Sequence, residues 1–565
     1  MTFQGKIGEG RGRGRWRDHG RKGRQMKDEA LAEIRALLGT RERRHDHLIE
    51  FLHMIQDEYG CLTADHLTAL AHDMRLAQTE IYEVATFYHH FDIVKEGETP
   101  PPDLTIRVCE SISCMLAGAE TLIAELEKGA DPEKIRIVRA PCMGRCAEAP
   151  AVRIGNREVG HATAPDLLAM AEKGETSPIV PAYTDLAAYR AEGGYKLLER
   201  VRRGEVTADD LMGTMSDAGL RGLGGAGFPA GKKWGFVRSY PGPRLMTING
   251  DEGEPGTFKD RVYLESDPHR TFEGALIAAH AVEAGRIYLY MRDEYRNVLE
   301  ILDREIAALE DAGIISRGFI ELRRGAGAYI CGEESAMIES IEGKRGLPRN
   351  RPPYIAEVGL FGRPTLNHNV ETLWWIRDIM EKGPEWFAAQ GREGHPGARS
   401  WSVSGRVRNP GVKLAPAGIT VRELIDEYCG GMADGHTFKA YLPGGASGGV
   451  LPASMGDIPL DFGGELAKLG AFVGSHAIVI FSDQDNMRDV TSNLMKFFKH
   501  ESCGQCTPCR EGTAKMAHML QQDQPIDEEA MQDLEIVMRD SSICGLGQAA
   551  PNPVTHLLKY FREDL

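Results

Sequence analysis

The chain has 565 residues, too many for one hydrophobic core, so roughly three to five domains are expected. Its composition, 42% hydrophobic and 27% charged, is that of a soluble globular protein, and the longest apolar runs, such as 471–481, are too short to span a membrane. The formal net charge of −16 argues against general nucleic-acid binding by the body of the protein.

The first 27 residues depart from this acidic balance. They carry nine Lys or Arg against Glu9 and Asp18, a local charge of +7 that leaves −23 for the remainder. Glycine alternates with arginine and no apolar stretch follows, so 1–27 is predicted as a disordered basic tail rather than a secretory signal. It is either a solvated tail or a docking arm for an acidic partner subunit, with RNA binding a more distant alternative.

Eleven cysteines favour metal sites over disulfides. Eight of them fall into two spaced sets, and Cys61, Cys331 and Cys429 stand alone. In a protein of this size, two spaced sets of cysteines indicate metal ligation rather than a disulfide framework. Free cysteines of this kind are expected in a reducing cytoplasm.

Residues 28–95 show a 3.6-residue hydrophobic period and are predicted as a helical bundle. The segment is rich in histidine, but the spacings do not repeat as metal ligands do. We interpret these histidines as surface or core residues: His45, His47, His53, His66, His72, His89 and His90.

Residues 96–175 are predicted as a thioredoxin-like domain. Strands at 104–108 and 135–139, a helix at 117–128, a hairpin at 151–159 and a closing helix at 165–172 give that order. The strands deliver two cysteine pairs to one end of the sheet. A gap of four residues in the first pair suits a [2Fe-2S] cluster better than structural zinc, and the predicted ligands are Cys109, Cys114, Cys142 and Cys146.

After a predicted linker at 176–199, residues 200–398 are expected to form an α/β domain around one stretch, 222–261. Its glycines let backbone N–H groups approach a phosphate, its lysines add positive charge, and its acids can accept hydrogen bonds from ribityl or ribose hydroxyls. The predicted helix at 208–218 argues against a Rossmann fingerprint, and Ala226 and Lys233 do not fit a P-loop. An ordinary surface turn is the alternative.

Alternating strands and helices between 244 and 323 predict doubly wound units whose strand ends carry the acids. A second glycine stretch, 325–334, opens a further helix, and its backbone N–H groups are expected to be free for a ligand.

Short β segments in 399–484 predict a β-grasp domain with one helix at 421–428, and the glycines at 444–449 are interpreted as a structural turn. Residues 485–565 are predicted as a helical domain. Three cysteines on one tight loop and a distant fourth suit a [4Fe-4S] cluster better than zinc, with the ligands Cys503, Cys506, Cys509 and Cys544.

Several segments together resemble the NADH-oxidising flavoprotein subunit of respiratory complex I. They are the glycine and acid stretch, 329–334, 342–346, 369–372 and the cysteine segment 501–513. Residues 28–175, including 84–88, resemble its thioredoxin-like partner. The resemblance covers nearly everything except the basic tail and the linker.

The resemblance implies site residues. Those that match FMN contacts are Gly222, Gly224, Lys233, Asn249, Asp251, Glu252, Gly332, Glu333, Glu334 and Asn369. Those that match the NAD(H) site are Phe228, Phe236, Glu254, Arg351 and Tyr354. His368 stands where the family has an asparagine, which places that flavin contact in question, although imidazole can also donate a hydrogen bond.

Fusion of both subunits in one chain is similar to the diaphorase (beta) subunit of NAD-dependent formate dehydrogenases that contain molybdenum or tungsten. NAD-reducing hydrogenases use a related fused subunit. We therefore predict that the chain is a cytoplasmic electron-transfer subunit of a hetero-oligomer. The predicted partner is a large formate dehydrogenase subunit, and hydrogenase subunits are the alternative. Such a flavin converts hydride to single electrons and requires no catalytic acid or base. The competing class is a zinc-stapled assembly protein without turnover.

Overall fold

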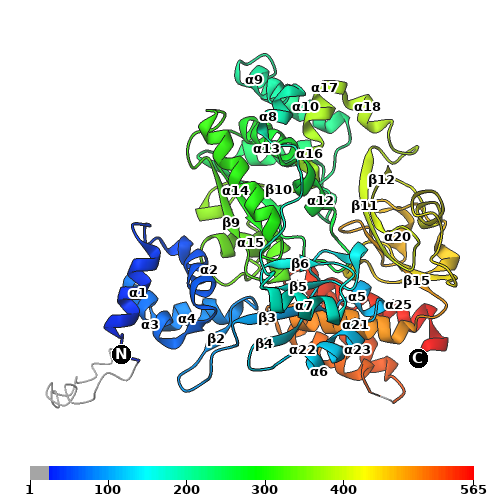
Figure 1. The fold of residues 1–565 in the computed structure, drawn as a ribbon. Helices are drawn as coiled ribbons and strands as arrows, with labels where there is room; N and C mark the ends of the chain where they lie inside the picture. The colour runs from blue at the N-terminus through cyan, green and yellow to red at the C-terminus, as the bar shows by residue number, and fades with distance from the viewer. Residues whose placement is uncertain (1–23, 523) are drawn as a thin grey trace, which may run out of the picture.

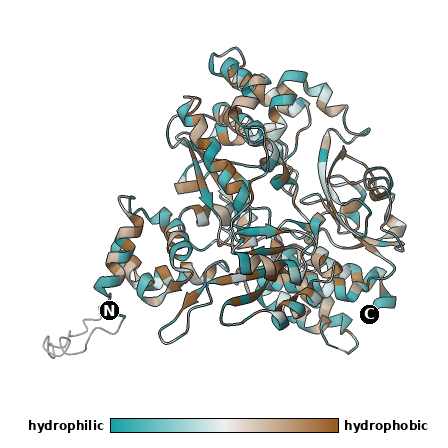
Figure 2. Ribbon diagram, in the orientation of Figure 1, coloured by the Kyte–Doolittle hydropathy of each residue, from teal (hydrophilic) through white to brown (hydrophobic). Residues whose placement is uncertain are grey.

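The computed structural model describes residues 24–522 and 524–565. Figure 1 shows helices of the N-terminal bundle on one side, α/β helices above, a β domain on the other side, and C-terminal helices below the centre. Figure 2 shows hydrophobic residues along the strands, and helices that carry both hydrophobic and hydrophilic residues. One cluster of buried side chains runs from the N-terminal bundle through the α/β and β domains to the C-terminal helices. In the described part of the chain, no helix is long and apolar enough to cross a membrane.

The predicted bundle is confirmed as a helical unit. Leu31, Ile34 and Leu38 lie on one buried face of the first helix, which packs against the third. The elements are α1 (Asp28–Leu38), η1 (His45–His47), α2 (Leu48–Tyr59), β1 (Leu62–Thr63), α3 (Ala64–Met74), α4 (Gln78–Phe87) and β2 (Ile93–Val94). Most of the basic tail, residues 1–23, lies outside the described residues. At the end of the tail, Arg24 and Lys27 form ion pairs with Asp65.

The next unit has the predicted strand, helix, strand, hairpin and helix order. Its sheet has the strand order β4-β3-β5-β6, with β3 and β4 parallel and the hairpin antiparallel. A short extra helix, α5, carries Cys114 ahead of the predicted one. The elements are β3 (Leu104–Cys109), α5 (Ile112–Leu116), α6 (Ala119–Gly129), β4 (Ile135–Ala140), η2 (Cys146–Glu148), β5 (Val152–Ile154), β6 (Arg157–Val159) and α7 (Ala164–Lys173).

The segment predicted as a linker, 176–199, is partly folded. Tyr189 is buried and its hydroxyl donates to Glu273 at 2.7 Å, while Tyr183 donates to Glu305 at 2.7 Å. Buried tyrosines with carboxylate partners fix this segment on the α/β domain. The packed part contains α8 (Leu186–Ala191) and the start of α9 (Lys196–Arg202).

The α/β domain is built on a parallel sheet of strand order β10-β7-β8-β9. Its strands were predicted except β10, which aligns Asn369 with Asn249 on β7. The elements are α10 (Ala208–Asp217), α11 (Ala230–Ser239), β7 (Arg244–Gly250), α12 (Lys259–Ser266), α13 (Pro268–Val282), β8 (Ala284–Met291), α14 (Arg296–Asp311), β9 (Ile320–Arg324), η3 (Tyr329–Gly332), α15 (Glu334–Ile341), η4 (Leu360–Gly362), β10 (Thr365–Asn369), α16 (Val370–Trp374), α17 (Ile376–Lys382) and α18 (Pro384–Ala388).

The β domain has a mixed sheet of order β12-β11-β15-β13-β14. The helix predicted at 421–428 is one turn of α-helix continued by a π-helix, η5. The elements are β11 (Ala398–Gly405), β12 (Gly411–Pro416), α19 (Val421–Glu423), η5 (Leu424–Tyr428), β13 (Phe438–Leu442), η6 (Ala446–Gly448), β14 (Leu451–Pro452), η7 (Ala453–Met455), α20 (Gly464–Lys468) and β15 (Ala477–Ser482).

The C-terminal unit is helical, as predicted. Its helices pack on the β domain and on α5 of the thioredoxin-like domain, where Asn493 donates to the Glu110 carbonyl at 2.8 Å. The elements are α21 (Met487–Glu501), α22 (Thr507–Leu520), α23 (Glu528–Ser541), α24 (Gly545–Ala549), α25 (Asn552–Tyr560) and η8 (Arg562–Asp564).

Candidate functional site

The first glycine loop, residues 222–231, follows α10 and opens α11, so a helix and not a strand precedes it. This confirms that the loop is not a Rossmann turn. A Cβ atom built on Gly224 would lie 2.8 Å from the Asn369 Cβ, so only glycine allows this approach to the end of β10.

Two asparagines lie side by side where the parallel strands β7 and β10 end. Asn249 donates through Nδ2 to the Gly332 carbonyl at 2.8 Å and accepts from the Asp251 amide at 3.0 Å. Asn369 accepts from the Glu371 amide at 3.0 Å and caps α16. The strand ends, the first glycine loop and the second glycine loop (residues 325–334) therefore meet at one edge of the sheet.

Asp251 faces this junction with an unpaired oxygen. Its Oδ2 atom is buried and has no hydrogen-bond partner among the described residues. Burial raises the pKa of this carboxyl well above its ordinary value. A buried acceptor without a donor favours a ligand that carries hydroxyl or N–H groups.

Glu252 points away from the junction. Its carboxylate accepts from the amides of Asp260 at 2.8 Å and Arg261 at 3.2 Å, and from the Tyr295 hydroxyl at 3.1 Å. Burial, with the neighbouring Asp260 charge, raises its pKa to about 8. Glu252 therefore supports the start of α12.

The expectation that the N-terminus of α15 is open to a ligand is wrong. The Glu333 carboxylate already accepts from the amides of Ser335 at 3.0 Å and Ala336 at 3.1 Å. Arg351 forms ion pairs with Glu333 and, at 3.3 Å, with Glu334. The Glu334 carboxylate also accepts a hydrogen bond from Lys233 at 3.3 Å. The helix caps itself because a glutamate occupies its N-cap position.

His368 belongs to the core. Its Nε2 accepts from Trp234 Nε1 at 2.6 Å, and burial lowers the pKa of the imidazole well below its ordinary value. The neutral ring joins β10 to α11.

Glu254 is held from two other segments. The Tyr329 hydroxyl donates to it, and Ser447 donates to it through its amide and hydroxyl, each at 2.8 Å. Gly445 has φ +78°, and a Cβ there would lie 2.6 Å from the Glu254 Cγ. The glycine turn at 444–449 thus contacts Glu254, a predicted residue of the NAD(H) site. Sequence spacing alone did not indicate that Ser447 holds this carboxylate.

Two exposed aromatic side chains lie close together at the first glycine loop and α11. The rings of Phe228 and Phe236 are 6.2 Å apart, and Tyr354, three residues after Arg351 in the sequence, is also exposed. Large exposed aromatic side chains offer faces on which a planar ring can stack.

The N-terminal cysteines converge as predicted. Sγ of Cys142 lies 3.3 Å from that of Cys146, and the Cys109 thiol lies within hydrogen-bond reach of Cys114 and Cys142. All four are buried. Phe258 packs against Cys142 and Cys146, so the acid stretch touches this set.

The C-terminal cysteines also converge, because all four line one cavity. The same cavity is lined by Ile330 from the second glycine loop. Both converging thiol sets provide the four sulfur ligands that an iron–sulfur cluster needs.

Two arginines, to which the sequence analysis assigned no role, connect the α/β domain to the thioredoxin-like domain. Arg292 donates to the carbonyls of Glu252 and of Cys142, the latter at 2.6 Å, and Arg261 donates to the Gly144 carbonyl at 3.1 Å. Neither has a spacing signal, since the bonds to the Cys142 and Gly144 carbonyls span more than 100 residues of sequence.

Family profiles match the chain in the same order as these domains. They are the thioredoxin-like [2Fe-2S] ferredoxin over residues 34–174, the Nuo51 FMN-binding domain over 215–378, the SLBB domain over 402–451 and the NADH-ubiquinone oxidoreductase-F iron-sulfur binding region over 489–565.

The chain is 40% identical over 393 residues to an F-type NADH-quinone oxidoreductase subunit of Rhizobium meliloti (strain 1021), with 67% of this chain and 93% of that protein covered. The chain belongs to this family of NADH-quinone oxidoreductase flavoproteins. The mitochondrial NADH dehydrogenase [ubiquinone] flavoprotein 1 of Dictyostelium discoideum is 39% identical, with 66% of this chain and 80% of that protein covered.

A solved NAD+-reducing [NiFe]-hydrogenase contains a chain of the same overall fold. That chain in the H2-reduced state has a TM-score of 0.81 and 32% identity, and the match covers 93% of this chain and 92% of that one. The air-oxidised state gives a TM-score of 0.79.

As a flavoprotein of this family, the chain is an NADH:acceptor oxidoreductase and electron-transfer protein. It carries FMN-binding, [2Fe-2S] and [4Fe-4S] domains, in agreement with the cluster assignments made over zinc.

Proposed function

We propose that this chain is the diaphorase subunit of a multisubunit NAD-linked complex. It exchanges hydride between NAD(H) and FMN and passes single electrons between FMN and its two clusters. The observation that carries the proposal is the position of the acid stretch and second glycine loop between the cysteine sets: Phe258 packs against Cys142 and Cys146, and Ile330 lines the cavity of the other four.

The residues present fit FMN. The unpaired Asp251 oxygen and the close approach at Gly224 provide an acceptor and a glycine-lined cradle. We assign FMN contacts to the sequence-predicted residues that line this junction: Gly222, Gly224, Lys233, Asn249, Asp251, Gly332, Glu334 and Asn369. Glu252 and Glu333 support the site from behind, since backbone amides occupy their carboxylates. FMN, when bound, supplies the exchange between two-electron and one-electron chemistry.

The nicotinamide nucleotide is assigned to the exposed aromatic group. Phe228, Phe236 and Tyr354 are exposed and offer stacking faces. The Arg351 side chain is 37% exposed and pairs with Glu333 and Glu334, and its guanidinium suits a phosphate. Glu254, fixed by Tyr329 and Ser447, is placed to orient the dinucleotide. These residues bind and orient, and none has to transfer a proton.

For the partner, a hydrogenase module has more support than the formate dehydrogenase module preferred from sequence. The support is the whole-chain similarity to a chain of an NAD+-reducing [NiFe]-hydrogenase. Co-purification followed by metal analysis separates the two: nickel and hydrogen-dependent NAD+ reduction would support the hydrogenase, and molybdenum or tungsten with formate-dependent reduction would support formate dehydrogenase.

NADH-driven reduction of an artificial dye by the purified chain tests the diaphorase itself. We expect FMN-dependent turnover, about six irons per chain, and a rise of roughly tenfold in KM for NADH in Glu254→Ala, which loses one charged hydrogen-bonding group. A colourless protein with stoichiometric zinc and no dye reduction would contradict the proposal and support the assembly-protein class.

A further inference from the structure

Three groups of histidine and carboxylate side chains in the described chain lie close enough to suggest a metal ion, but their surroundings argue against one. In the first, His53 and His90 face Asp293, whose carboxylate already pairs with Arg153 at 2.9 Å and with Arg296 and Arg324. Despite burial, which would raise it, these guanidinium groups hold the pKa of Asp293 well below its ordinary value. A cation would have to displace them.

The other two groups fail for equally local reasons. Asp46 and Glu321, beside His47, both pair with Arg323. His89 and His500, beside Glu501, have ring centroids 4.1 Å apart and ring planes tilted by 32°. The Glu501 carboxylate already accepts from the Tyr329 amide at 2.9 Å, so an ion there would compete with this hydrogen bond.

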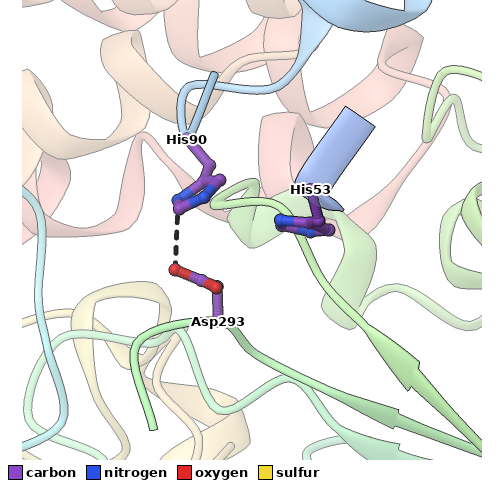
Figure 3. A group of neighbouring side chains, drawn as sticks. All are labelled: His53, His90 and Asp293. Carbon is purple, nitrogen blue, oxygen red and sulfur yellow. Dashed lines mark ion pairs between the residues drawn. The ribbon is translucent and has the colours of Figure 1, made fainter. Parts of the chain in front are cut away.

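The first group instead joins the N-terminal bundle to the second glycine loop (Figure 3). His53, on α2, lies with Nε2 2.9 Å from the Gly325 carbonyl oxygen. Burial lowers the pKa of His53 well below its ordinary value, so the ring is neutral. Because a carbonyl only accepts, the proton is on Nε2, and Nδ1 is left without a partner among the described residues.

His90 makes the neighbouring contact. Its backbone amide donates to the Ala326 carbonyl at 3.2 Å, and its Nδ1 lies 3.0 Å from Asp293 on the α/β domain. A Cβ built on Gly327 would lie 3.3 Å from the His90 nitrogen, so the two backbones are in close contact. The start of the loop is therefore fixed by residues outside its own domain.

The other half of the loop is fixed separately. The Tyr329 amide donates to Glu501 at 2.9 Å, and Asn249 holds the Gly332 carbonyl at 2.8 Å. One of these anchors, Tyr329, also donates to Glu254, and the next residue, Ile330, lines the C-terminal cysteine cavity. Only three residues separate Gly325 from Tyr329, so a shift at Gly325 and Ala326 would strain the Tyr329 anchor and through it both candidate sites.

We propose that His53 and His90 are positioning residues for the flavin site, and that docking of the N-terminal bundle completes this site. The inference rests on the proposed function, because it takes the second glycine loop as part of the FMN cradle. Loss of the His53 donor leaves a buried carbonyl unsatisfied, and the loop opens to recover a partner from water.

The test uses the full chain with its clusters intact. His53→Phe keeps a ring for packing against His90 and Phe91 but removes the donor, whereas His53→Gln keeps an N–H that can reach the same carbonyl. His66→Phe is the matched control, because His66 is also a buried bundle histidine but its hydrogen bond is to Glu33 within the bundle.

After removal of the flavin, FMN affinity is measured by fluorescence quenching, together with the flavin midpoint potential and the temperatures of flavin release and global unfolding. We expect His53→Phe to weaken FMN binding about tenfold, the effect of one lost buried hydrogen bond. It should also release flavin below its unfolding temperature and shift the flavin potential, while His53→Gln and His66→Phe bind FMN as wild type does. If His53→Phe does not fold, His53→Asn, whose shorter amide cannot reach the carbonyl, takes its place.

Wild-type affinity and potential in the donor-less variant would overturn the positioning role alone. An equal loss in His53→Gln and His66→Phe would also overturn it, because general destabilisation would then explain the effect. Absence of FMN from the wild-type protein would overturn the proposed function and this inference with it.

Discussion

The two cysteine sets differ in how they are enclosed. The N-terminal thiols come from a strand end, a short helix, a loop and a 3-10 turn, and each is at most 5% exposed. The C-terminal thiols come from the loop before α22, the first turn of α22 and the turn before α24, and Cys503, Cys506 and Cys544 are only half-buried. The α/β domain seals the first set, whereas the second opens toward the surface.

This difference in enclosure predicts different chemical accessibility for the two cysteine sets. A sealed cluster is protected from solvent and depends on several segments folding together. A cluster near the surface is accessible to an external electron donor or acceptor, at the cost of exposure to oxidants and chelators.

The largest expected effect comes from removing one ligand from each set. Cys114→Ser should lower the iron content from about six to about four per chain, and Cys509→Ser to about two, because each cluster needs its four thiolates. Iron analysis with electron paramagnetic resonance checks both. Loss of both spectra in either variant would show that the two sets are not independent.

A second test compares accessibility. An iron chelator added to the intact protein should remove iron from the C-terminal set at least about tenfold faster, since the N-terminal set is released only by local unfolding. The single-cluster variants above assign each kinetic phase. Equal rates would contradict the difference in enclosure.

Electrostatic control of the clusters should differ as well. Arg292 is buried and donates to the Cys142 carbonyl, whereas Arg510 is exposed and donates to the Gly504 carbonyl at 2.6 Å. Arg292→Gln should lower the potential of the N-terminal cluster on the order of 50 mV, because a buried positive charge favours the reduced cluster. Arg510→Gln is the matched control, with a smaller shift at the C-terminal cluster because solvent screens its charge. Redox titration of both variants measures the two shifts. A larger shift in Arg510→Gln than in Arg292→Gln would contradict the predicted difference between the clusters.

The smallest effect concerns pH at the junction beside the C-terminal set. Burial and the neighbouring His500 lower the pKa of His89 to about 4. The unfolded state then binds more protons between about pH 6.5 and 4, so stability is full above this window and falls as pH falls through it. Since the ring is exposed at one side, the loss is about 1 kcal/mol or less. Urea titration should give a flatter pH profile for His89→Gln, and an unchanged slope would argue against this contribution.

Much of the fold followed from local pattern. Helical periodicity located α1 to α4, alternating strands and helices located β3 to β9, and cysteine spacing predicted both thiol sets. Such signals are readable because the residues that cause them are close in sequence. The strand β10 was missed because its residues 365–369 are mostly polar, and the folded part of the linker was missed because its tyrosines find their carboxylates 80 residues or more away.

By itself, the amino-acid sequence determined the order of domains, the two sets of four spaced cysteines and the two glycine-rich stretches. Only the tertiary structure decided which predicted acids are available: Asp251 keeps an unpaired oxygen, while Glu252 and Glu333 are taken up by helix amides. It also decided that His53, His90 and Ser447 from other domains hold the candidate site. The reason is physical, because spacing records ligands on one segment but not hydrogen bonds whose donors and acceptors are brought together only by packing.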